Sequence, residues 1–588
     1  MKRLLILPLL LLTLSLSATP ISEQKAREIA AKFFSTNATR SSAVELELAW
    51  AGDDAYKISN VQTRSTSDSA LMYIYNRTDS KGFVIIAGDD SSPRPILAFS
   101  NDNDFNTNNV ADGARLLLSD LCSQIEDTKH STLSSSEFST RADVGNVVCE
   151  YKTALWGQGA PFKNASPHGR IGCVTTALAI VLHYNKWPDR GVGTTPSYYY
   201  TGSDNVSYEV PANTLGRTYH YNVMLDKYKG VNYTSEQGEA VSALFYDIGT
   251  AVQARFDENN TTPLIDQWGK PLGEYFRYNK GSQKLERANY HDSEWLDKIK
   301  ENLTTHGPTI YRGTHAEDNG GHAFVMDGYT DANYFRFNFG WDGSSNGYYL
   351  ISLTEVNYPR KQAAIFYLSP DRDGSSTQTY RDDLALAYRT GSNGEIYSGI
   401  NTDATEYQSG KTFTTYVSIF NRGVNTFNGQ VGIAHCDKAN NIKSILVTKN
   451  LTRNVNTVGT FAFSTKLNPG DIALGDKLRV IYKGNNPTDW QFMRRRNETA
   501  TEEVLLCATP DEVAESLTLE YDKAKQSLSF SSIHAIQFTM KSSTGETITT
   551  AELTAHTKHS ISTASLEKGE YTLSFSSGGE PYILKVIF

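Results

Sequence analysis

Hydrophobic and polar positions follow two different periods in the first part of the chain. The apolar residues of 21–34 recur at helical spacing and predict an amphipathic helix, and 113–130 shows a similar pattern. Between them, apolar runs at 71–75 and 83–87 are bounded by Gly, Asn or Asp and predict strands. Residues 19–140 are therefore expected to form one compact α+β module.

The pattern changes further along the chain. A polar stretch at 128–145 is typical of an exposed linker that ends the first module. Residues 145–372 mix helical patterns with aromatic-rich strands. Short alternating strands between Gly and Asn turns predict a β-sandwich at 376–503, and a last β-rich unit is expected at 510–588.

The N-terminus predicts export. Lys2 and Arg3 precede an apolar stretch from Leu4 to Leu16, and small residues follow up to Ala18. This is the pattern of a secretory signal peptide at 1–18. An uncleaved N-terminal anchor is the less favoured alternative, because the apolar run is short for a membrane span. We expect a protein that is secreted or held at the cell surface.

Composition narrows the class of protein. A chain of 588 residues is expected to hold roughly three to five domains. Hydrophobic residues make up 39%, which excludes a largely disordered polypeptide. The net charge of −9 and the lack of a long basic block argue against a nucleic-acid partner. The five cysteines are too few for a disulfide scaffold, and their odd number leaves at least one thiol unpaired within the chain.

One of these cysteines has the setting of a nucleophile. Apolar residues at i, i+4, i+7 and i+8 from Val174 predict a helix with a buried face that ends before Pro188. Cys173 lies in its first turn, directly after Gly172. The partial positive charge of a helix N-terminus favours the thiolate. The alternative is that Cys173 is only a small buried hydrophobe.

A second segment supplies the partners that a reactive thiol needs. Gly321 belongs to a turn, and His322 begins a predicted strand that continues into a hairpin with 334–339. The hairpin is expected to bring Asn338 near His322. A cysteine followed by His and Asn roughly 150 residues downstream is the order of papain-type chemistry. In that chemistry His deprotonates the thiol and Asn orients the imidazole.

Two loops complete the candidate site. Gln158 lies in a Gly-rich loop upstream of Cys173, where its amide and the cysteine N–H are candidates to donate to an oxyanion. By itself a Gln in such a loop more often marks only a turn. Trp341 lies in a second Gly-rich loop, and we take it with Gly172 and Gly321 as a candidate for lining the substrate cleft.

Several segments across 145–370 resemble, in order and separation, the C10 family of cysteine peptidases, the group of streptopain and interpain. The resemblance implies a papain-like fold with Cys173 as nucleophile and His322 as general base and acid. It also implies that Asn338 orients the imidazole and that Gln158 donates to the oxyanion. The matching segments are Trp156–Phe162, Gly172–Val174, His183–Pro188, Val241–Val252, Gly321–Val325 and Asn338–Gly343.

The sequence departs from the family pattern at three places. The family has Asn-Trp-Gly-Trp-Gly-Gly, and this chain has Phe339 for the first Trp and Asp342 for a Gly. The first change concerns a Trp that shields the contact between His and Asn in the family. The family's Ser/Gly-rich substrate loop is replaced by Asp257–Pro263, so the substrate preference stays open.

The flanking modules also show resemblances. Residues 19–140 are similar to the pro-domain of these zymogens, which occupies the active-site cleft until it is removed. Residues 510–588 are similar to the sorting tails of type IX secretion cargo, which implies the secretion machinery as a partner. An ordinary Ig-like accessory domain is the alternative for this last unit. Lys129 and Arg141 in the linker are the basis for a hypothesis of cleavage there.

The expected fold class is α+β, with a papain-like domain between an α+β pro-domain and two all-β, Ig-like modules. The expected function is that of a secreted zymogen of a cysteine endopeptidase that acts on protein or peptide substrates, with its own pro-domain as intramolecular inhibitor. No cofactor motif is present, and His315 and Asp318 lack the further ligands of a zinc site. The rival functions are an impaired relative that acts as a binding, inhibitor-like or adhesin protein, and thiol chemistry on small substrates.

Overall fold

The computed structural model describes most of residues 19–588. The predicted signal peptide, most of the linker with Lys129 and Arg141, and His315 and Asp318 lie outside the described residues. The residues left out are 1–18, 37–43, 60–69, 93, 129–142, 258–260, 315–320, 352–361, 391–395, 405–406, 408–409, 469–471, 474, 497–498, 508–509, 533–535, 554–557 and 578–580. Among the helices that are described, none has the length and apolar character of a membrane span.

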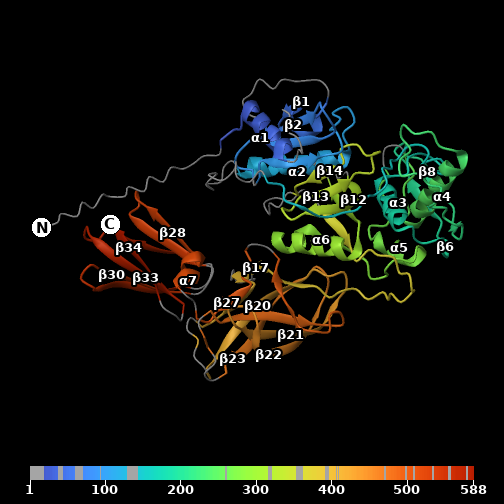
Figure 1. The fold of residues 1–588 in the computed structure, drawn as a ribbon. Coiled ribbons are helices and arrows are strands. Elements are labelled where there is room, and N and C mark those ends of the chain that lie inside the picture. Colours follow the sequence, from blue (N-terminus) through green and yellow to red (C-terminus); the bar gives the residue numbers. More distant parts are fainter. Residues whose placement is uncertain are drawn as a thin grey trace. The chain divides into compact units, whose positions relative to one another are not determined.

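The chain divides into two compact units, residues 1–288 with 292–378 and residues 289–291 with 379–588 (Figure 1). The first unit contains the α+β module and the region of the candidate site. Its N-terminal elements are α1 (Glu23–Thr36), β1 (Leu46–Gly52), the 3₁₀ helix η1 (Ala55–Lys57), β2 (Met72–Arg77), β3 (Phe83–Ala87), β4 (Ile96–Ser100) and α2 (Asp112–Thr128). The helices and strands predicted in 19–140 are therefore confirmed, with their ends shifted by a few residues.

The rest of the first unit mixes helices and strands. Its helices are α3 (Cys173–Asn185), α4 (Ser235–Ala251), α5 (Gly269–Tyr275), η3 (Arg287–Asn289) and α6 (Asp292–His306). Its strands are β5 (Val147–Glu150), β6 (Thr194–Thr195), β7 (Tyr198–Thr201), β8 (Ser207–Val210), β9 (Asn213–Thr214), β10 (Gln283–Glu286), β11 (Thr309–Thr314), β12 (Gly321–Thr330), β13 (Phe335–Asn338), β14 (Gly347–Tyr349) and β15 (Ala363–Phe366).

One sheet runs through both parts of this unit. Its order is β1-β2-β3-β4-β14-β13-β12-β11-β15-β10, with β5 paired to β12. Strand β4 joins the N-terminal module to the rest, because Phe99 pairs with Tyr348 and Ala98 with Tyr349. All residues of β3 and β4 are buried, as expected for strands in the interior of a sheet that is covered on both faces. The predicted hairpin is confirmed, since β12 and β13 pair antiparallel.

Helix α2 covers one face of this sheet beside β11 and β12. Gly113 of α2 lies against the rings of Phe324 and Phe339. A Cβ atom at Gly113 would be 2.7 Å from a ring carbon of each. The amide of Gln362 donates to Asp120 of the helix at 2.9 Å. The N-terminal module is thus attached both through strand pairing and through the packing of α2.

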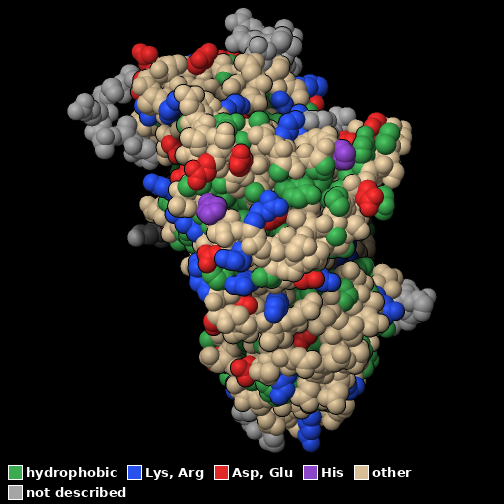
Figure 2. All heavy atoms as spheres, turned by 90° about the vertical axis from the view of Figure 1, so that its right-hand side faces the viewer, with side chains coloured by type: hydrophobic (Ala, Val, Ile, Leu, Met, Phe, Trp, Pro, Cys, Tyr) green, Lys and Arg blue, Asp and Glu red, His purple; other side chains and the backbone are tan. Residues whose placement is uncertain are grey.

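Helices α3 and α4 lie on the other side of the site region and share one apolar core. Helix α4 starts with a capping box, in which Thr234 and Gln237 each bind the other's backbone N–H. Residues 174–183 of α3 are all buried, and Val325 of β12 belongs to the same core. Figure 2 shows the side of the first unit that carries these helices, where hydrophobic side chains gather in a patch.

The second unit is rich in strands. Two five-stranded sheets contribute to one apolar core, and a three-stranded and a four-stranded sheet follow around a separate core. The predicted divisions of the chain at 140–145 and 503–510 stay predictions. The elements are β16 (Leu384–Leu386), β17 (Tyr388–Thr390), β18 (Ile396–Ser398), β19 (Ile400–Thr402), β20 (Thr412–Asn421), β21 (Phe427–Cys436), β22 (Ile442–Arg453), β23 (Val458–Lys466), β24 (Lys477–Lys483), β25 (Gln491–Phe492), β26 (Arg494–Arg495), β27 (Glu503–Leu505), the helix α7 (Pro510–Ser516), β28 (Leu517–Asp522), β29 (Ser527–Ser532), β30 (Ile536–Ser542), β31 (Thr547–Leu553), β32 (His559–Ser562), β33 (Glu570–Ser576) and β34 (Tyr582–Ile587).

The contact of Gly113 predicts a stability effect. Ala is normally the better helix former by about 1 kcal/mol, but at this position its methyl group would overlap two rings that are themselves packed. We expect Gly113→Ala to destabilise the full chain by about 1–3 kcal/mol, measured by thermal unfolding. Gly159→Ala is the control, since no heavy atom lies within 4 Å of a Cβ there. Equal unfolding temperatures for the two variants would contradict the packing described.

Candidate active site

Cys173 is the first residue of α3, and Gly172 precedes the helix with φ of 89°. This left-handed backbone favours glycine, and a Cβ on Gly172 would be 2.8 Å from the side chain of Thr261. The first amide groups of a helix have no partners within it, and together with the helix dipole they favour an anion at this point. The sequence therefore places the thiol where a thiolate is stabilised.

His322 is the second residue of β12 and contacts Cys173. Burial by itself raises the pKa of the Cys173 thiol. The hydrogen bond with His322, the charge of the imidazole and the backbone N–H groups of Ala323 and Val174 outweigh burial, so the pKa lies below its usual value. The structure thus brings the two residues predicted as the reactive pair into direct contact.

Asn338 is buried at the end of β13, where it pairs with Val325, three residues beyond His322 in β12. Its Nδ2 donates to Thr153 Oγ1 at 2.9 Å and to the Ala154 carbonyl at 2.8 Å. Its Oδ1 accepts from the Gly340 N–H at 3.1 Å. These contacts fix the amide beside the site, while its predicted role in orienting His322 stays a prediction.

The two loops predicted to complete the site lie against each other. The Asp342 N–H donates to the Trp156 carbonyl at 3.0 Å, and a Cβ on Gly157 would be 2.4 Å from the Asp342 carboxylate. Gln158 follows Gly157 and is half-buried. Asp342, which stands where the family has Gly, has φ of 57° in the left-handed region. Its carboxylate lies 3.6 Å from Lys229.

Residues of the N-terminal module reach the same place, although no sequence motif marks them. Asp112, the first residue of α2, lies with its carboxylate 4.0 Å from His322 Nε2. The Trp341 indole donates to the Asn109 side chain at 3.1 Å, and Asn103 donates to the Gly343 carbonyl at 2.9 Å. Gly321, the third candidate for the cleft, is exposed beside His322. The segment from 103 to 112 therefore follows the Trp341 loop up to the histidine.

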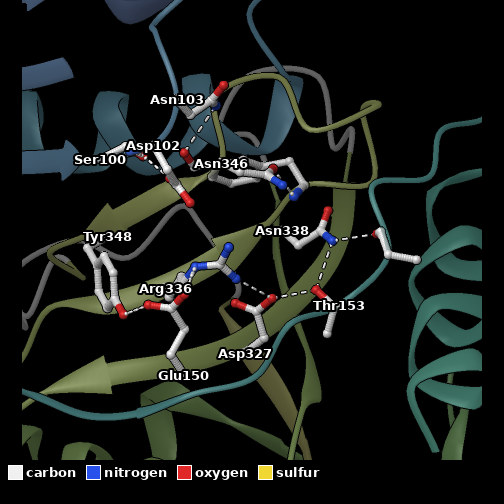
Figure 3. Close-up of polar contacts among 12 residues, drawn as sticks. Ser100, Asp102, Asn103, Glu150, Thr153, Asp327, Arg336, Asn338, Asn346 and Tyr348 are labelled. Atoms are coloured by element: carbon white, nitrogen blue, oxygen red, sulfur yellow. Dashed lines mark hydrogen bonds and ion pairs between the residues drawn. The ribbon is translucent and has the colours of Figure 1, made fainter. Parts of the chain in front are cut away.

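A polar network continues from Asn338 through buried Asp327 to Glu150, which is exposed (Figure 3). Thr153 Oγ1 donates to Asp327 Oδ2 at 2.5 Å, and Arg336 donates to the same oxygen at 2.7 Å. Glu150 lies 3.7 Å from Arg336 and accepts from the Tyr348 hydroxyl at 2.6 Å. Burial raises the pKa of Asp327 to about 6, while the charge of Arg336 opposes this effect. The ion pair with Arg336 favours the carboxylate form of Asp327.

No sequence motif marks this network, although one signal is present in the sequence. Asp327 interrupts an otherwise apolar strand, and a buried charge of this kind requires a partner. Phe339, the other departure from the family pattern, is buried in an aromatic cluster, with its ring centre 5.2 Å from that of Phe324 and 5.3 Å from that of Tyr349. This is the face that Gly113 of α2 covers.

Other titratable side chains lie apart from this site. His183 is buried in α3, ten residues beyond Cys173, and lies 3.0 Å from Asp226, so it is a packed histidine. The five cysteines all lie among the described residues and form no disulfide with one another. The part of the chain that the structure describes contains no group of three His, Cys, Asp or Glu side chains able to hold a metal ion.

Comparisons with known proteins agree with this geometry. Residues 156–349 match the model of the Peptidase C10 family, and residues 18–125 match that of the Spi protease inhibitor. The chain is 28% identical to streptopain of Streptococcus pyogenes over 319 residues, which cover 50% of this chain and 77% of streptopain. It is 28% identical to the thiol protease/hemagglutinin PrtT of Porphyromonas gingivalis over 368 residues, which cover 59% of this chain and 40% of that protein.

A solved structure of a mutant prointerpain A fragment from Prevotella intermedia is also similar. It is 26% identical, with a TM-score of 0.44, and the match covers 56% of this chain and 99% of the fragment. The family-model match spans the segment that carries Cys173 and His322, and a pro-domain-like match precedes it. Residues 156–349 are therefore similar to the Peptidase C10 family of cysteine peptidases.

Proposed function

We propose that this chain is the zymogen of an exported, papain-like cysteine endopeptidase that hydrolyses peptide bonds in proteins. The observation that carries the proposal is the contact between Cys173, at the start of α3, and His322, at the start of β12. The lowered pKa of the thiol provides a thiolate, which is the form that attacks a carbonyl carbon.

In the acylation step, the Cys173 sulfur forms a bond to the scissile carbonyl carbon, and the carbonyl electrons move to its oxygen. Gln158 and the Cys173 backbone N–H are the proposed donors to this oxyanion. When the oxyanion collapses, the C–N bond breaks and His322 gives its proton to the leaving amine. The product is a thioester on Cys173, and the amine fragment of the substrate is released.

Deacylation uses the same groups in reverse order. His322, now neutral, takes a proton from water while the water oxygen attacks the thioester carbonyl. The C–S bond then breaks, which releases the carboxylic acid and regenerates the thiolate beside a protonated imidazole. Asn338 is proposed to keep the imidazole in the orientation that both steps need.

The contacts of the N-terminal module support the zymogen part of the proposal. Asn109 and Asp112 lie against Trp341 and His322, where a substrate would have to bind. A module in this place would block the cleft for as long as it stays bound, and a cut in the linker at 128–145 is the step that would allow it to leave. A folded module that covers the cleft also favours proteins over small molecules as substrates, because excluding a small molecule would not require so large a covering segment.

The remaining assignments rest on sequence resemblance. Residues 1–18 are proposed to direct export, and the protein is proposed to act outside the cell or at its surface. The second unit is proposed to contain two Ig-like sandwiches, of which the last, residues 510–588, would engage a secretion machinery. Pairing of β33 with β34, the strands that carry the resemblance, is compatible with a sandwich of this kind.

The reactive pair predicts how the thiol and the activity respond to substitution. We expect Cys173→Ala and His322→Ala each to lower kcat/KM on a protein substrate by a factor on the order of 10³ or more. Exposed His220 supplies the matched control, His220→Ala, which should keep full activity. Internal cleavage products in the mass spectrum distinguish an endopeptidase from an enzyme that removes single terminal residues. Labelling by a thiol-directed epoxide that does not occur at Cys173 would overturn the proposed function.

The same pair predicts a pH dependence. His322 lowers the pKa of Cys173 against the effect of burial, so His322→Ala should raise that pKa above the wild-type value. The rate of alkylation by iodoacetamide at Cys173, followed from pH 4 to pH 10, should therefore show a higher midpoint in the variant. Burial raises the pKa of Cys149 and raises that of Cys436 to about 11, so these thiols react at higher pH. An unchanged midpoint would contradict the role of His322.

The zymogen proposal predicts self-processing. The wild-type chain should lose its N-terminal module by a cut within 128–145, whereas Cys173→Ala should stay full length when it is incubated alone. Asn109→Ala removes the contact with Trp341 and should speed processing several-fold, and exposed Asn108→Ala is its control. Mass spectrometry of the incubated samples gives the result. An active form that retains the intact chain from residue 19 would overturn the proposal.

A further inference from the structure

The amide of Asn338 can adopt only one orientation in this fold. The Ala154 carbonyl, 2.8 Å from Nδ2, can only accept a hydrogen bond. The Gly340 N–H, 3.1 Å from Oδ1, can only donate one. Rotation of the amide by 180° would place Oδ1 against the Ala154 carbonyl, both acceptors, and Nδ2 against the Gly340 N–H, both donors. The two backbone groups therefore determine which end of the amide carries the oxygen.

Thr153 adds a second and stronger constraint. Asp327 Oδ2 already accepts from the Arg336 guanidinium at 2.7 Å, so this oxygen of the ion pair acts as an acceptor and the single hydroxyl proton of Thr153 goes to it at 2.5 Å. The Thr153 oxygen must then accept the second N–H of Asn338, at 2.9 Å. Both N–H groups and one lone pair of Oδ1 of the Asn338 side chain are engaged in this way. The second lone pair of Oδ1 remains able to accept a hydrogen bond.

The position of Asp327 is itself fixed. Its side chain is fully buried, and Arg336 of the neighbouring strand β13 donates to it at 2.7 Å. Arg336 is flanked by Glu150 of β5 at 3.7 Å, which in turn accepts from Tyr348 of β14. Four strands of one sheet therefore hold the carboxylate in place (Figure 3). The two donors on Oδ2 and the ion pair with Arg336 restrain the carboxylate within this part of the sheet.

We propose that Thr153 and Asp327 are positioning residues of this peptidase, which hold the Asn338 amide so that the open lone pair of Oδ1 accepts the imidazole N–H of His322. The inference rests on the proposed function, because it requires Asn338 to orient His322. Asn338 and His322 lie at the same end of the β12–β13 hairpin, three residues out of register. Thr153 acts only through Asn338 and touches neither substrate nor thiol.

The experiment uses processed enzyme and compares Thr153→Val with Thr153→Ser. Valine keeps the shape of threonine and removes the hydroxyl, so the second N–H of Asn338 loses its acceptor. We expect kcat to fall about tenfold while KM stays within about twofold, the change typical of a lost general acid–base alignment. The midpoint of Cys173 alkylation should also rise, and serine should restore kcat and midpoint to near the wild-type values.

Two further variants separate positioning from simple structural support. Thr309→Val removes another buried hydroxyl from the same sheet, one that donates to the Ile365 carbonyl, and should lower thermal stability without changing kcat. In a background of Asn338→Ala, the substitution Thr153→Val should cause no further loss of kcat, because the residue it positions is absent. Asp327→Asn is the substitute variant if Thr153→Val does not fold. The Asn amide can donate to Thr153 as well as accept from it, so the Thr153 hydroxyl is no longer held as an acceptor for Asn338, and kcat should again fall.

The possible results decide between the proposals. Thr153→Val and Asp327→Asn with reduced thermal stability but unchanged kcat and alkylation midpoint would overturn the positioning role. Additive losses in the Asn338→Ala background would also overturn it, since Thr153 would then act by another route. In both cases Cys173→Ala remains inactive and the proposed function stands. A processed wild-type enzyme that neither hydrolyses protein nor reacts at Cys173 would overturn both proposals.

Discussion

The contact between Cys173 and His322 is the constraint on which the rest of the first unit depends. Cys173 begins a helix and His322 lies at the start of a strand. A hydrogen bond between their side chains requires the positions of α3 and β12 relative to each other to be fixed to within a fraction of an ångström. The fold meets this requirement with one shared core, in which Val174 of α3 packs together with Ala323 and Val325 of β12. Gly172 is needed for the same reason, since its left-handed backbone lets the chain turn into α3 beneath Thr261.

Local periodicity was sufficient to predict the elements that carry the reactive pair. The apolar face of α3 and the alternation along β12 and β13 each depend on a few neighbouring residues, so both could be recognised from the sequence. The pairing of β4 with β14 and the approach of Asp112 to His322 could not, because they join residues more than 200 positions apart. Thr153 was missed for a related reason: an isolated threonine carries no pattern, and its importance appears only through its contacts.

Asp327 shows that this part of the sheet is not optimised for stability. Its folded-state pKa of about 6 lies above the ordinary value of an aspartate, so the folded state binds the proton more tightly than the unfolded chain. The contribution of protonated Asp327 to the free energy of unfolding is fully present below about pH 4 and is lost as the pH rises through about 6. The free energy of unfolding then falls by an amount on the order of 3 kcal/mol. Its Oδ1 is buried without a hydrogen-bond partner among the described residues. An apolar residue would avoid this cost but could not direct the Thr153 proton.

The pairing of β4 with β14 has a consequence for how the family's chemistry would be switched on. The N-terminal module is bound through a strand ladder and through α2, and neither depends on the linker. Cutting the linker would therefore convert an intramolecular contact into a complex of two separate molecules, whose occupancy depends on their concentration. Molecules that are cut in a crowded compartment would stay covered, and dilution into a larger volume would release the enzyme. Scission and activation would then be two events separated in space.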